Sequence, residues 1–312
     1  MNPAPIPIFL NPAAGAGRAA RLQEKLEDEL RRFGVPYALH VTESEIHLRQ
    51  LTRQSAVDHR FIAGAGGDST FMIMAEEILR AGAGTALGLI GLGSSNDVPA
   101  AFGLDSIETA CRALRDRRRR RIDLGMILRD GIYSTYFLGQ ANLGLGAAVN
   151  RYVTALAARR PRLAAHQALA GFFGIREAYK HGRVPIRLRI DSGPSGVIED
   201  FFTVAVFANT PLWATGKRIA PEARPDDGLL DACLIAPCSM RRLARLYALA
   251  ATGRHVGEPE VRLLRSPEFA VGSESAFDVQ ADGEIVPGPG GPGKNALIIR
   301  ALPFALEILV PA

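Results

Sequence analysis

One stretch of the chain, residues 60–81, reads RFIAGAGGDSTFMIMAEEILRA. Its apolar start indicates a buried strand over Arg60–Ala63, and its end has the apolar spacing of a helix over Phe71–Ala81. The glycine-rich segment Gly64–Thr70 lies between them. Glycines let backbone amides approach a phosphate closely, and the N-terminus of the following helix attracts an anion. An ordinary structural turn explains such a segment equally well. The neighbouring segments of the chain are therefore needed to choose between a turn and a phosphate-binding loop.

The same alternation of strand and helix continues on both sides of this stretch. Further strands are predicted over Ile6–Leu10, Tyr37–Thr42 and Ala86–Ile90, and further helices over Ala19–Phe33, Ile46–Gln54 and Ser106–Arg115. Strands that alternate with helices predict a doubly wound, mostly parallel α/β sheet. In such sheets ligands bind at the carboxyl ends of the strands.

Two other predicted strands also end in loops suited to phosphate. Asn11–Arg18, with the sequence NPAAGAGR, follows the first strand, and Gly93–Asp97, with the sequence GSSND, follows the fourth. Arg18 can pair with a phosphate, and Gly93–Asp97 offers hydroxyls, an amide and a carboxylate. Each loop alone is explained equally well as a turn. Three of them at three strand ends predict one shared nucleotide site.

The pattern changes after the arginine run Arg117–Arg121. Its simplest interpretation is a solvated helix end, and the functional alternative is contact with anionic lipid headgroups. Short strand-like runs follow, at Met126–Leu128, Tyr133–Leu138, Ile186–Ile190, Phe201–Ala208, Leu230–Ile235, Glu268–Val271 and Phe277–Ala281. Helices are predicted within Val149–Lys180 and Ser239–Gly253. We therefore expect a nucleotide-binding α/β domain over residues 1–122 and a β-rich, mostly antiparallel domain over 123–294. The strand-like tail, residues 295–312, is expected to return to the first domain.

Composition narrows the class of protein. The chain has 312 residues, 47% of them hydrophobic and 22% charged, with a net charge of +5 and a pI of about 9.4. This balance is that of an ordinary globular protein, and a mild positive charge suits nucleotides and anionic membrane surfaces. The start of the chain has no basic segment typical of a signal peptide, so we expect a cytoplasmic protein. We expect no nucleic-acid partner.

The motifs together resemble the diacylglycerol kinase catalytic-domain family, which includes bacterial YegS-like lipid kinases and sphingosine kinases. The resemblance covers nearly the whole chain, and the order and spacing of its motifs make it specific. The matching segments are Asn11–Gly15, Gly66–Thr70, Gly93–Asp97, Asp123–Gly125, Asn142–Gly146, Ile219–Pro221, Asp226–Asp231 and Asp282–Glu284. It implies an ATP-dependent lipid kinase that transfers the γ-phosphate to a hydroxyl of diacylglycerol or a related lipid.

The resemblance also implies roles for particular residues. ATP, with Mg²⁺, would be bound by Asn11, Thr42, Gly66, Gly67, Asp68, Ser69, Thr70, Ser94, Asn96 and Asp97. Asp282 or Glu284 would accept the proton of the lipid hydroxyl as it attacks the phosphate. A structural metal would be bound by the Asp227 side chain and by the backbone carbonyls of Arg224 and Leu229. The implied partner is a lipid at the membrane surface, contacted peripherally, and a homodimer stays open.

Two departures from the family pattern keep other functions open. Ser69 stands where the family has glycine, and if that position requires a positive φ, serine costs on the order of 1 kcal/mol. Met72 and Ile73 stand in place of an Asn-Glu pair. A catalytically impaired lipid- or nucleotide-binding protein of the same fold is therefore one alternative. An NAD kinase-like enzyme is another, because NAD kinases share the Gly-Gly-Asp loop.

Overall fold

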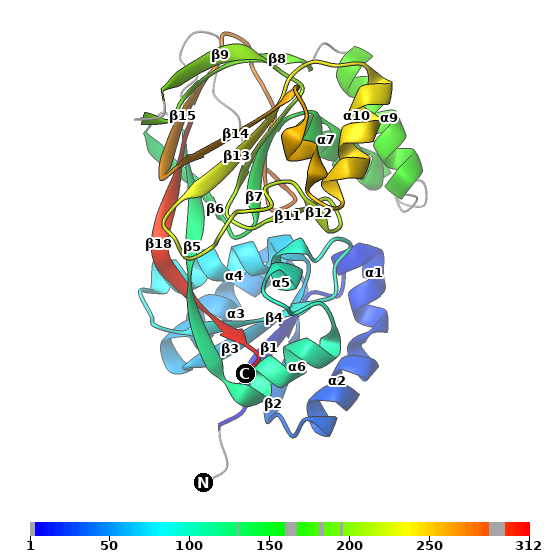
Figure 1. The fold of residues 1–312 in the computed structure, drawn as a ribbon. Coiled ribbons are helices and arrows are strands. Elements are labelled where there is room, and N and C mark those ends of the chain that lie inside the picture. The colour runs from blue at the N-terminus through cyan, green and yellow to red at the C-terminus, as the bar shows by residue number, and fades with distance from the viewer. Residues whose placement is uncertain (1–3, 130, 160–166, 181–183, 194–195, 287–296) are drawn as a thin grey trace. The chain divides into compact units, whose positions relative to one another are not determined.

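A computed structural model describes residues 4–129, 131–159, 167–180, 184–193, 196–286 and 297–312 (Figure 1). The predicted domain boundary at residues 294 and 295 lies outside these residues. The chain divides into two compact units. The first unit comprises Met1–Leu124, Ala214–Gly216 and Pro303–Ala312, and the second comprises Gly125–Trp213 and Lys217–Leu302.

The first unit is built on a parallel sheet, as predicted. Its strands are β1 (Ile6–Leu10), β2 (Tyr37–Val41), β3 (Phe61–Gly66), β4 (Ala86–Gly91) and the last part of β18 (Leu297–Val310), in the order β2-β1-β3-β4-β18. Leu10 pairs with Ala65, and Gly66 pairs with Gly91. This register brings the carboxyl ends of β1, β3 and β4 to one edge of the sheet.

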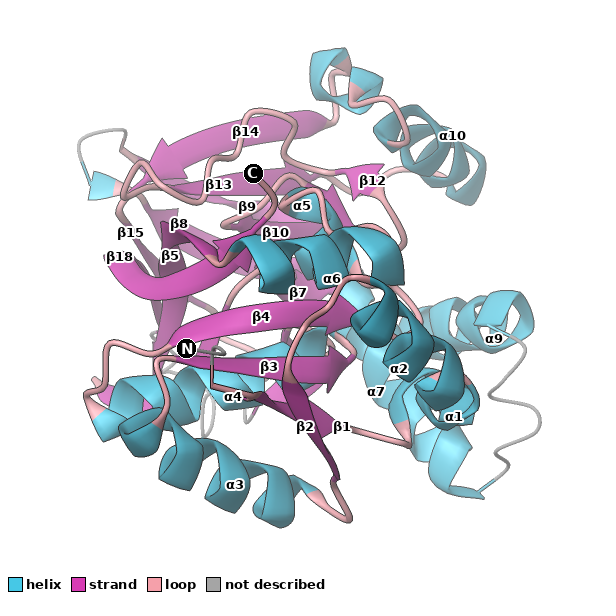
Figure 2. Ribbon diagram, turned by 90° about the horizontal axis from the view of Figure 1, so that it is seen from below, coloured by secondary structure: helices cyan, strands magenta, loops and turns pink. Residues whose placement is uncertain are grey.

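Helices cover both faces of this sheet. They are α1 (Ala14–Arg21), α2 (Gln23–Arg32), α3 (Glu45–Asp58), α4 (Asp68–Ala81), α5 (Asp97–Ala101) and α6 (Ile107–Asp116). Figure 2 shows α3 and α4 on one side of the strands and α6 on the other. The predicted helix Ala19–Phe33 is in fact two helices that meet at Leu22, whose backbone departs from helical geometry. Leu26 and Leu30 anchor the second of them in the core.

The second unit is β-rich and antiparallel, which also confirms the prediction. One sheet has the order β14-β13-β10-β7-β16-β17, formed by Val261–Ser266, Leu230–Ile235, Val204–Ala208, Gln140–Gly144, Val279–Ala281 and Glu284–Val286. The other strands are β5 (Arg118–Arg129), which begins in the first unit, β6 (Ile132–Phe137), β8 (Ile186–Asp191), β9 (Val197–Phe202), β11 (Leu212–Trp213), β12 (Lys217–Arg218) and β15 (Glu268–Gly272). The first part of β18 pairs antiparallel with β15.

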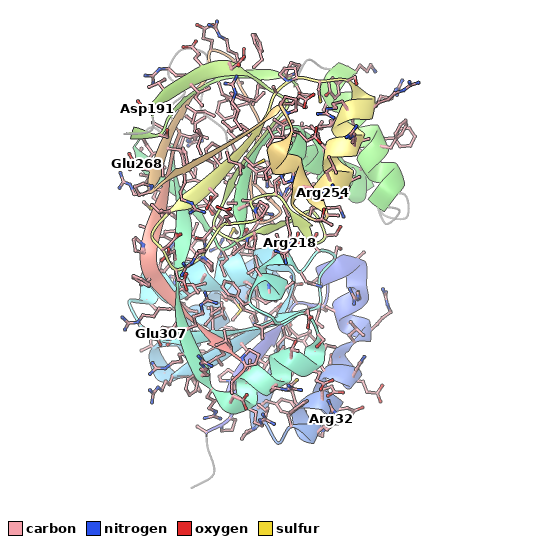
Figure 3. All side chains as sticks on the ribbon, viewed as in Figure 1. Arg32, Asp191, Arg218, Arg254, Glu268 and Glu307 are labelled. Carbon is pink, nitrogen blue, oxygen red and sulfur yellow. The ribbon has the colours of Figure 1, made fainter. Side chains whose placement is uncertain are left out.

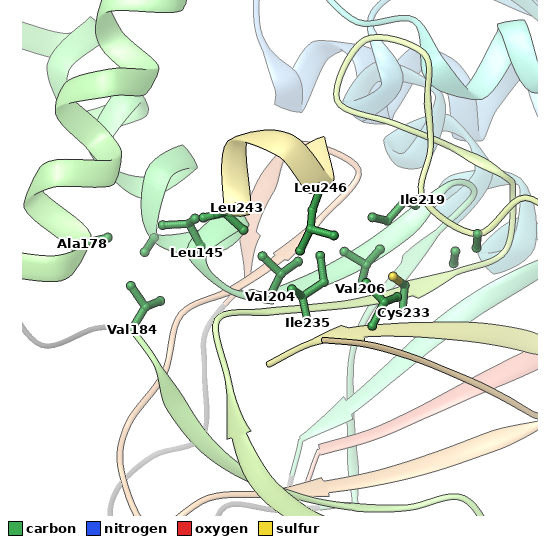
Figure 4. Close-up of a cluster of buried hydrophobic side chains, with 14 of the residues drawn as sticks. Leu145, Ala178, Val184, Val204, Val206, Ile219, Cys233, Ile235, Leu243 and Leu246 are labelled. Atoms are coloured by element: carbon green, nitrogen blue, oxygen red, sulfur yellow. The ribbon is translucent and has the colours of Figure 1, made fainter. Parts of the chain in front are cut away.

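Helices α7 (Leu145–Arg159), α9 (Gln167–Lys180) and α10 (Met240–Ala250) belong to the second unit, with the 3₁₀ turn η2 (Arg254–Gly257). Two helices therefore lie where one helical stretch, Val149–Lys180, was predicted. Figure 4 shows the core that they form with the sheet, where Leu243 and Leu246 of α10 approach Val204 and Val206 of β10. Burial of such aliphatic side chains contributes roughly 1.5–3 kcal/mol each.

The arginine run does not end a helix in solvent. Arg117 caps α6, and β5 begins at the next residue. Arg119 and Arg121 pair with Glu307 of β18, at 2.7 and 3.1 Å. The guanidinium of Arg120 lies over the Phe102 ring. Three of these arginines are therefore paired with a carboxylate or an aromatic ring of the same unit.

Candidate functional site

The three predicted loops meet at the carboxyl edge of the first unit's sheet. In chain order they are the first loop (Asn11–Arg18), the second loop (Gly64–Thr70) and the third loop (Gly93–Asp97). Hydrogen bonds join them in pairs. The Asn11 amide group donates to the Thr70 hydroxyl at 3.1 Å, and the Arg18 guanidinium donates to the Gly93 carbonyl at 3.2 Å. The Gly93 amide in turn donates to the Gly66 carbonyl at 3.0 Å. The expectation that these loops lie together is therefore confirmed.

The first loop turns through a left-handed backbone. Gly15, Ala16 and Gly17 have φ values of 61°, 55° and 81°. A Cβ added at Gly15 would lie 3.0 Å from the Leu92 carbonyl, so glycine is needed both for its backbone and for its size. Arg18, predicted to be able to pair with phosphate, is held against the Gly93 carbonyl and braces the loop.

The second loop leads directly into α4. Gly67 is extended, with φ −99° and ψ −178°, and the helix begins at Asp68. The first amides of a helix have no intrahelical acceptor, so this N-terminus can receive a phosphate. Ser69 lies in the first helical turn, where serine carries no backbone strain. The condition under which serine would cost energy here, a positive φ, is therefore not met.

Close packing explains two of the glycines at this edge. A Cβ on Gly66 would lie 2.4 Å from the Thr70 hydroxyl oxygen, and one on Gly93 would lie 2.6 Å from the Gly67 Cα. A larger residue at Gly93 would therefore push the second and third loops apart, and one at Gly66 would displace the Thr70 side chain within the second loop. The apolar residues in place of the family's Asn-Glu pair, Met72 and Ile73, are buried core residues of α4.

The third loop is shaped by its own side chains. Asn96 adopts a left-handed backbone with φ 55°, and its side chain both accepts from the Gly93 amide at 2.7 Å and donates to the Gly93 carbonyl at 3.1 Å. The Asp68 carboxylate accepts the Asp97 and Val98 amides, at 3.2 and 3.1 Å. Asp68 therefore fixes the second loop to the third.

Asp97 has a role that the sequence did not reveal. It is buried, and its carboxylate accepts the Thr215 amide at 3.1 Å and the Gly216 amide at 2.7 Å. Ala214, Thr215 and Gly216 all have positive φ, so this turn is held in a strained backbone. The carboxylate fastens a distant segment of the chain to the phosphate loops.

The two remaining predicted nucleotide contacts differ in their environment. The buried Thr42 hydroxyl donates to the Leu10 carbonyl at 3.1 Å, which ties the end of β2 to the end of β1. Ser94 is exposed at the tip of the third loop, where its hydroxyl can reach a ligand. Thr42 therefore shapes the edge of the sheet, and Ser94 is placed to contact what binds there.

The two candidate proton acceptors, Asp282 and Glu284, have different environments in the second unit. Asp282 and Gly283 form the tight turn between β16 and β17, with φ values of 42° and 94°. The buried Asp282 carboxylate accepts three backbone amides, from Leu138, Gly139 and Gln140, at 2.5, 3.0 and 3.0 Å. Protonation of this carboxylate would disrupt those bonds. Glu284 is exposed, which suits a group that exchanges a proton with a substrate.

The predicted metal-binding loop is closed by hydrogen bonds. The Asp227 carboxylate accepts the Leu229 amide at 3.0 Å, and the Arg224 guanidinium lies 3.4 Å from Asp226. Gly228 has φ 73°, as a tight turn requires. Within the residues that the structure describes, no three His, Cys, Asp or Glu side chains cluster as metal ligands do. The predicted site depends mainly on backbone carbonyls, so it stays a prediction.

No described helix combines the length and the apolar character needed to cross a bilayer.

Comparison with known proteins agrees with this arrangement. Residues 5–127 match the family model described as the diacylglycerol kinase catalytic domain. Residues 139–310, more than half of the chain, match the model described as the YegS C-terminal NAD kinase beta sandwich-like domain. The two matches together cover the phosphate loops and the Asp282–Glu284 turn.

Relatives and solved structures extend over the same length. A "Probable lipid kinase YegS-like" of Pseudomonas aeruginosa is 28% identical over 284 residues, which cover 90% of this chain and 87% of the relative. A "Diacylglycerol kinase" of Mycobacterium tuberculosis is 28% identical over 312 residues, 98% of this chain and 95% of the relative. A crystal structure of a diacylglycerol kinase from Bacillus anthracis str. Sterne superposes with a TM-score of 0.68 at 15% identity, covering 99% of this chain and 98% of that one. At that identity the superposition shows the fold. From the two family matches, this chain belongs to the YegS-like family of lipid kinases, in which a diacylglycerol kinase catalytic domain precedes the YegS C-terminal domain.

Proposed function

We propose that this protein transfers the γ-phosphate of ATP to a hydroxyl of diacylglycerol or a related lipid. The observation that carries the proposal is the fastening of three loops at one sheet edge. Asn11, Asp68 and Asn96 use their side chains to hold the loops together rather than to fill the space above them. That leaves the N-terminus of α4 facing outward from a rigid frame, as phosphate binding requires.

In this proposal the nucleotide phosphates lie on the first turn of α4. The amides of Gly67, Asp68 and Ser69 are the donors, and the Ser69 and Ser94 hydroxyls add further hydrogen bonds. Bound Mg²⁺ would neutralise charge on the phosphates. Mg²⁺ commonly keeps several waters and takes one or two carboxylates plus phosphates. Asp68 is the carboxylate at this position, and its two amide bonds fix its orientation for such a contact.

For the proton, we assign the acceptor role to Glu284 and a positioning role to Asp282. The hydroxyl of the lipid must lose its proton as it attacks the phosphorus, and a carboxylate can orient the hydroxyl and take that proton. The exposure of Glu284 supports its role. The three backbone amides that Asp282 accepts support its positioning role, because these bonds hold the turn that presents Glu284.

The test is transfer of label from [γ-³²P]ATP, with diacylglycerol, a sphingoid base, ceramide, phosphatidylglycerol and NAD as separate acceptors. We expect labelled lipid with the wild-type chain and a loss of transfer in Glu284→Gln. Loss of one general base typically costs about 10²–10⁴-fold in rate. Labelled NAD without labelled lipid would contradict the proposal. If the chain binds nucleotide but transfers phosphate to no acceptor, the alternative of a catalytically impaired lipid- or nucleotide-binding protein is favoured.

A further inference from the structure

Helix α10 carries a basic face that neither the core nor the proposed chemistry uses. The segment Ser239–Gly257, which contains α10 and η2, has four arginines and no acidic residue. Leu243, Leu246 and Ala250 face the core of the second unit. The opposite side of the helix is exposed, so the composition of that side reflects what it meets.

The exposed side of α10 combines apolar and cationic groups in an ordered way. Met240 and Tyr247, 48% and 45% exposed, stand seven residues apart and so share one face, with Ala244 between them. Arg241 and Arg245 are both exposed, and helical spacing puts them together along one side of this stripe, with Arg241 the nearer. Aromatic and apolar side chains bordered by arginine are typical of helices that lie at a membrane surface.

Neighbouring elements of the same unit add positive charge to this face. Lys217 of β12 lies 5.1 Å from the centre of the Tyr247 ring. The Arg218 side chain begins beside Gly253, which precedes Arg254 of η2. Figure 3 labels Arg218 and Arg254 in this part of the molecule, and both are exposed. We call these groups, Met240, Arg241, Ala244, Arg245, Tyr247, Lys217, Arg218 and Arg254, the α10 surface.

The acidic residues nearby are already used on another side of the helix. Glu258 and Glu260 both pair with Arg242, which points away from the Met240–Tyr247 stripe. Arg245 is 3.9 Å from Glu258, at the limit of an ion pair. The positive charge of the α10 surface is therefore not cancelled within the segment that forms it.

We infer that the α10 surface docks the protein on the anionic headgroups of a lipid bilayer. Charge complementarity identifies the occupant, because several arginines around an apolar stripe match phosphate headgroups over acyl chains. The inference rests on the proposed function, since a lipid kinase must meet its acceptor at a bilayer. It also corrects the earlier candidate, the arginine run at residues 117–121, whose charges are received by Glu307 and Phe102.

The chain contains a natural reporter for this docking. Trp213 is its single tryptophan, and its ring centre lies 6.3 Å from that of Tyr247. Bromine atoms on the acyl chains of a bilayer quench tryptophan that comes close to them. Fluorescence of the full chain can therefore measure docking at this surface.

The experiment titrates the full chain, without nucleotide, with vesicles of phosphatidylcholine alone or mixed with brominated phosphatidylglycerol. We expect binding and quenching with the mixed vesicles, weakened by salt. Each cation near an anionic surface contributes about fivefold in affinity, so Arg241→Gln with Arg245→Gln should weaken binding roughly 25-fold. Arg31→Gln with Arg112→Gln removes the same charge from exposed sites in the other unit and should leave binding unchanged.

A matched pair at one exposed position tests the sign of the charge. Ala244→Glu should weaken vesicle binding and Ala244→Lys should strengthen it, and both residues are good helix formers. Equal weakening by both would overturn the inference in favour of a protein partner, and so would equal binding by the two double variants. The measurement uses neither ATP nor the acceptor lipid. A chain that docks without transferring phosphate would thus count against the proposed function alone.

Discussion

Replacing Asp282 by asparagine separates a structural carboxylate from a catalytic one. The Asp282 carboxylate accepts three buried amides, from Leu138, Gly139 and Gln140. Asparagine keeps one acceptor oxygen and turns an N–H group toward a backbone N–H. At least one charge-assisted bond is lost, and two buried donors lack acceptors.

The expected cost follows from those contacts. A hydrogen bond to a charged group contributes about 1.5–3 kcal/mol, and an unsatisfied buried donor costs about 1–3 kcal/mol. Asp282→Asn should therefore destabilise the second unit by roughly 3–5 kcal/mol. For a unit of its size this lowers Tm by roughly 6–20 °C. Glu284→Gln, at an exposed position, should melt with the wild type.

Differential scanning calorimetry and the phosphate-transfer assay are measured on the same preparations. We expect Asp282→Asn to lose stability and Glu284→Gln to lose kcat with its stability intact. The assignment fails if Asp282→Asn melts with the wild type but no longer transfers phosphate, because Asp282 would then be the group that takes the proton.

Three further changes test the loops and the core. Gly93→Ala places a Cβ against the neighbouring loop and should weaken ATP binding at least tenfold by calorimetric titration, whereas Gly84→Ala, in open space with an ordinary backbone, should not. Ser69→Gly should leave ATP affinity no better and lower stability by about 0.5–1 kcal/mol in denaturant melts, because the position is helical; a gain in activity would refute this. Burial holds the pKa of His255 below its usual 6.5. Below pH 6.5 the unfolded chain therefore binds a proton at this histidine that the folded chain does not bind. Stability should therefore fall as pH drops below 6.5, and His255→Gln should reduce this dependence.

Local patterns predicted the first unit well because its elements are defined locally. The strand before the glycine-rich loop, observed as Phe61–Gly66, and the helix after it, Asp68–Ala81, differ from prediction by a few residues at their ends. An apolar run bounded by glycine is enough to indicate where one strand or helix begins and ends. The meeting of three loops followed from the parallel order of the strands, which is also a general property of the fold.

Roles that depend on distant contacts were not predictable. Nothing near Asp97 in the sequence indicates that it accepts amides from Thr215 and Gly216, more than a hundred residues later. The arginine run likewise forms a strand by pairing with β18, near the other end of the chain. The difference between Asp282 and Glu284 arises from burial, which two neighbouring carboxylates in one motif do not reveal. In each case the deciding partner comes from another part of the chain.

The long strand β18 has a consequence for biosynthesis. Its final part belongs, with the rest of Pro303–Ala312, to the unit formed mainly by residues up to Leu124, and it supplies the neighbour of β4. The ribosome must therefore add nearly two hundred further residues before that sheet can close. Until then the open edge of β4 is a template for pairing with other chains. A nascent chain of this protein should depend on chaperone protection for most of its translation, even though its first domain is encoded first.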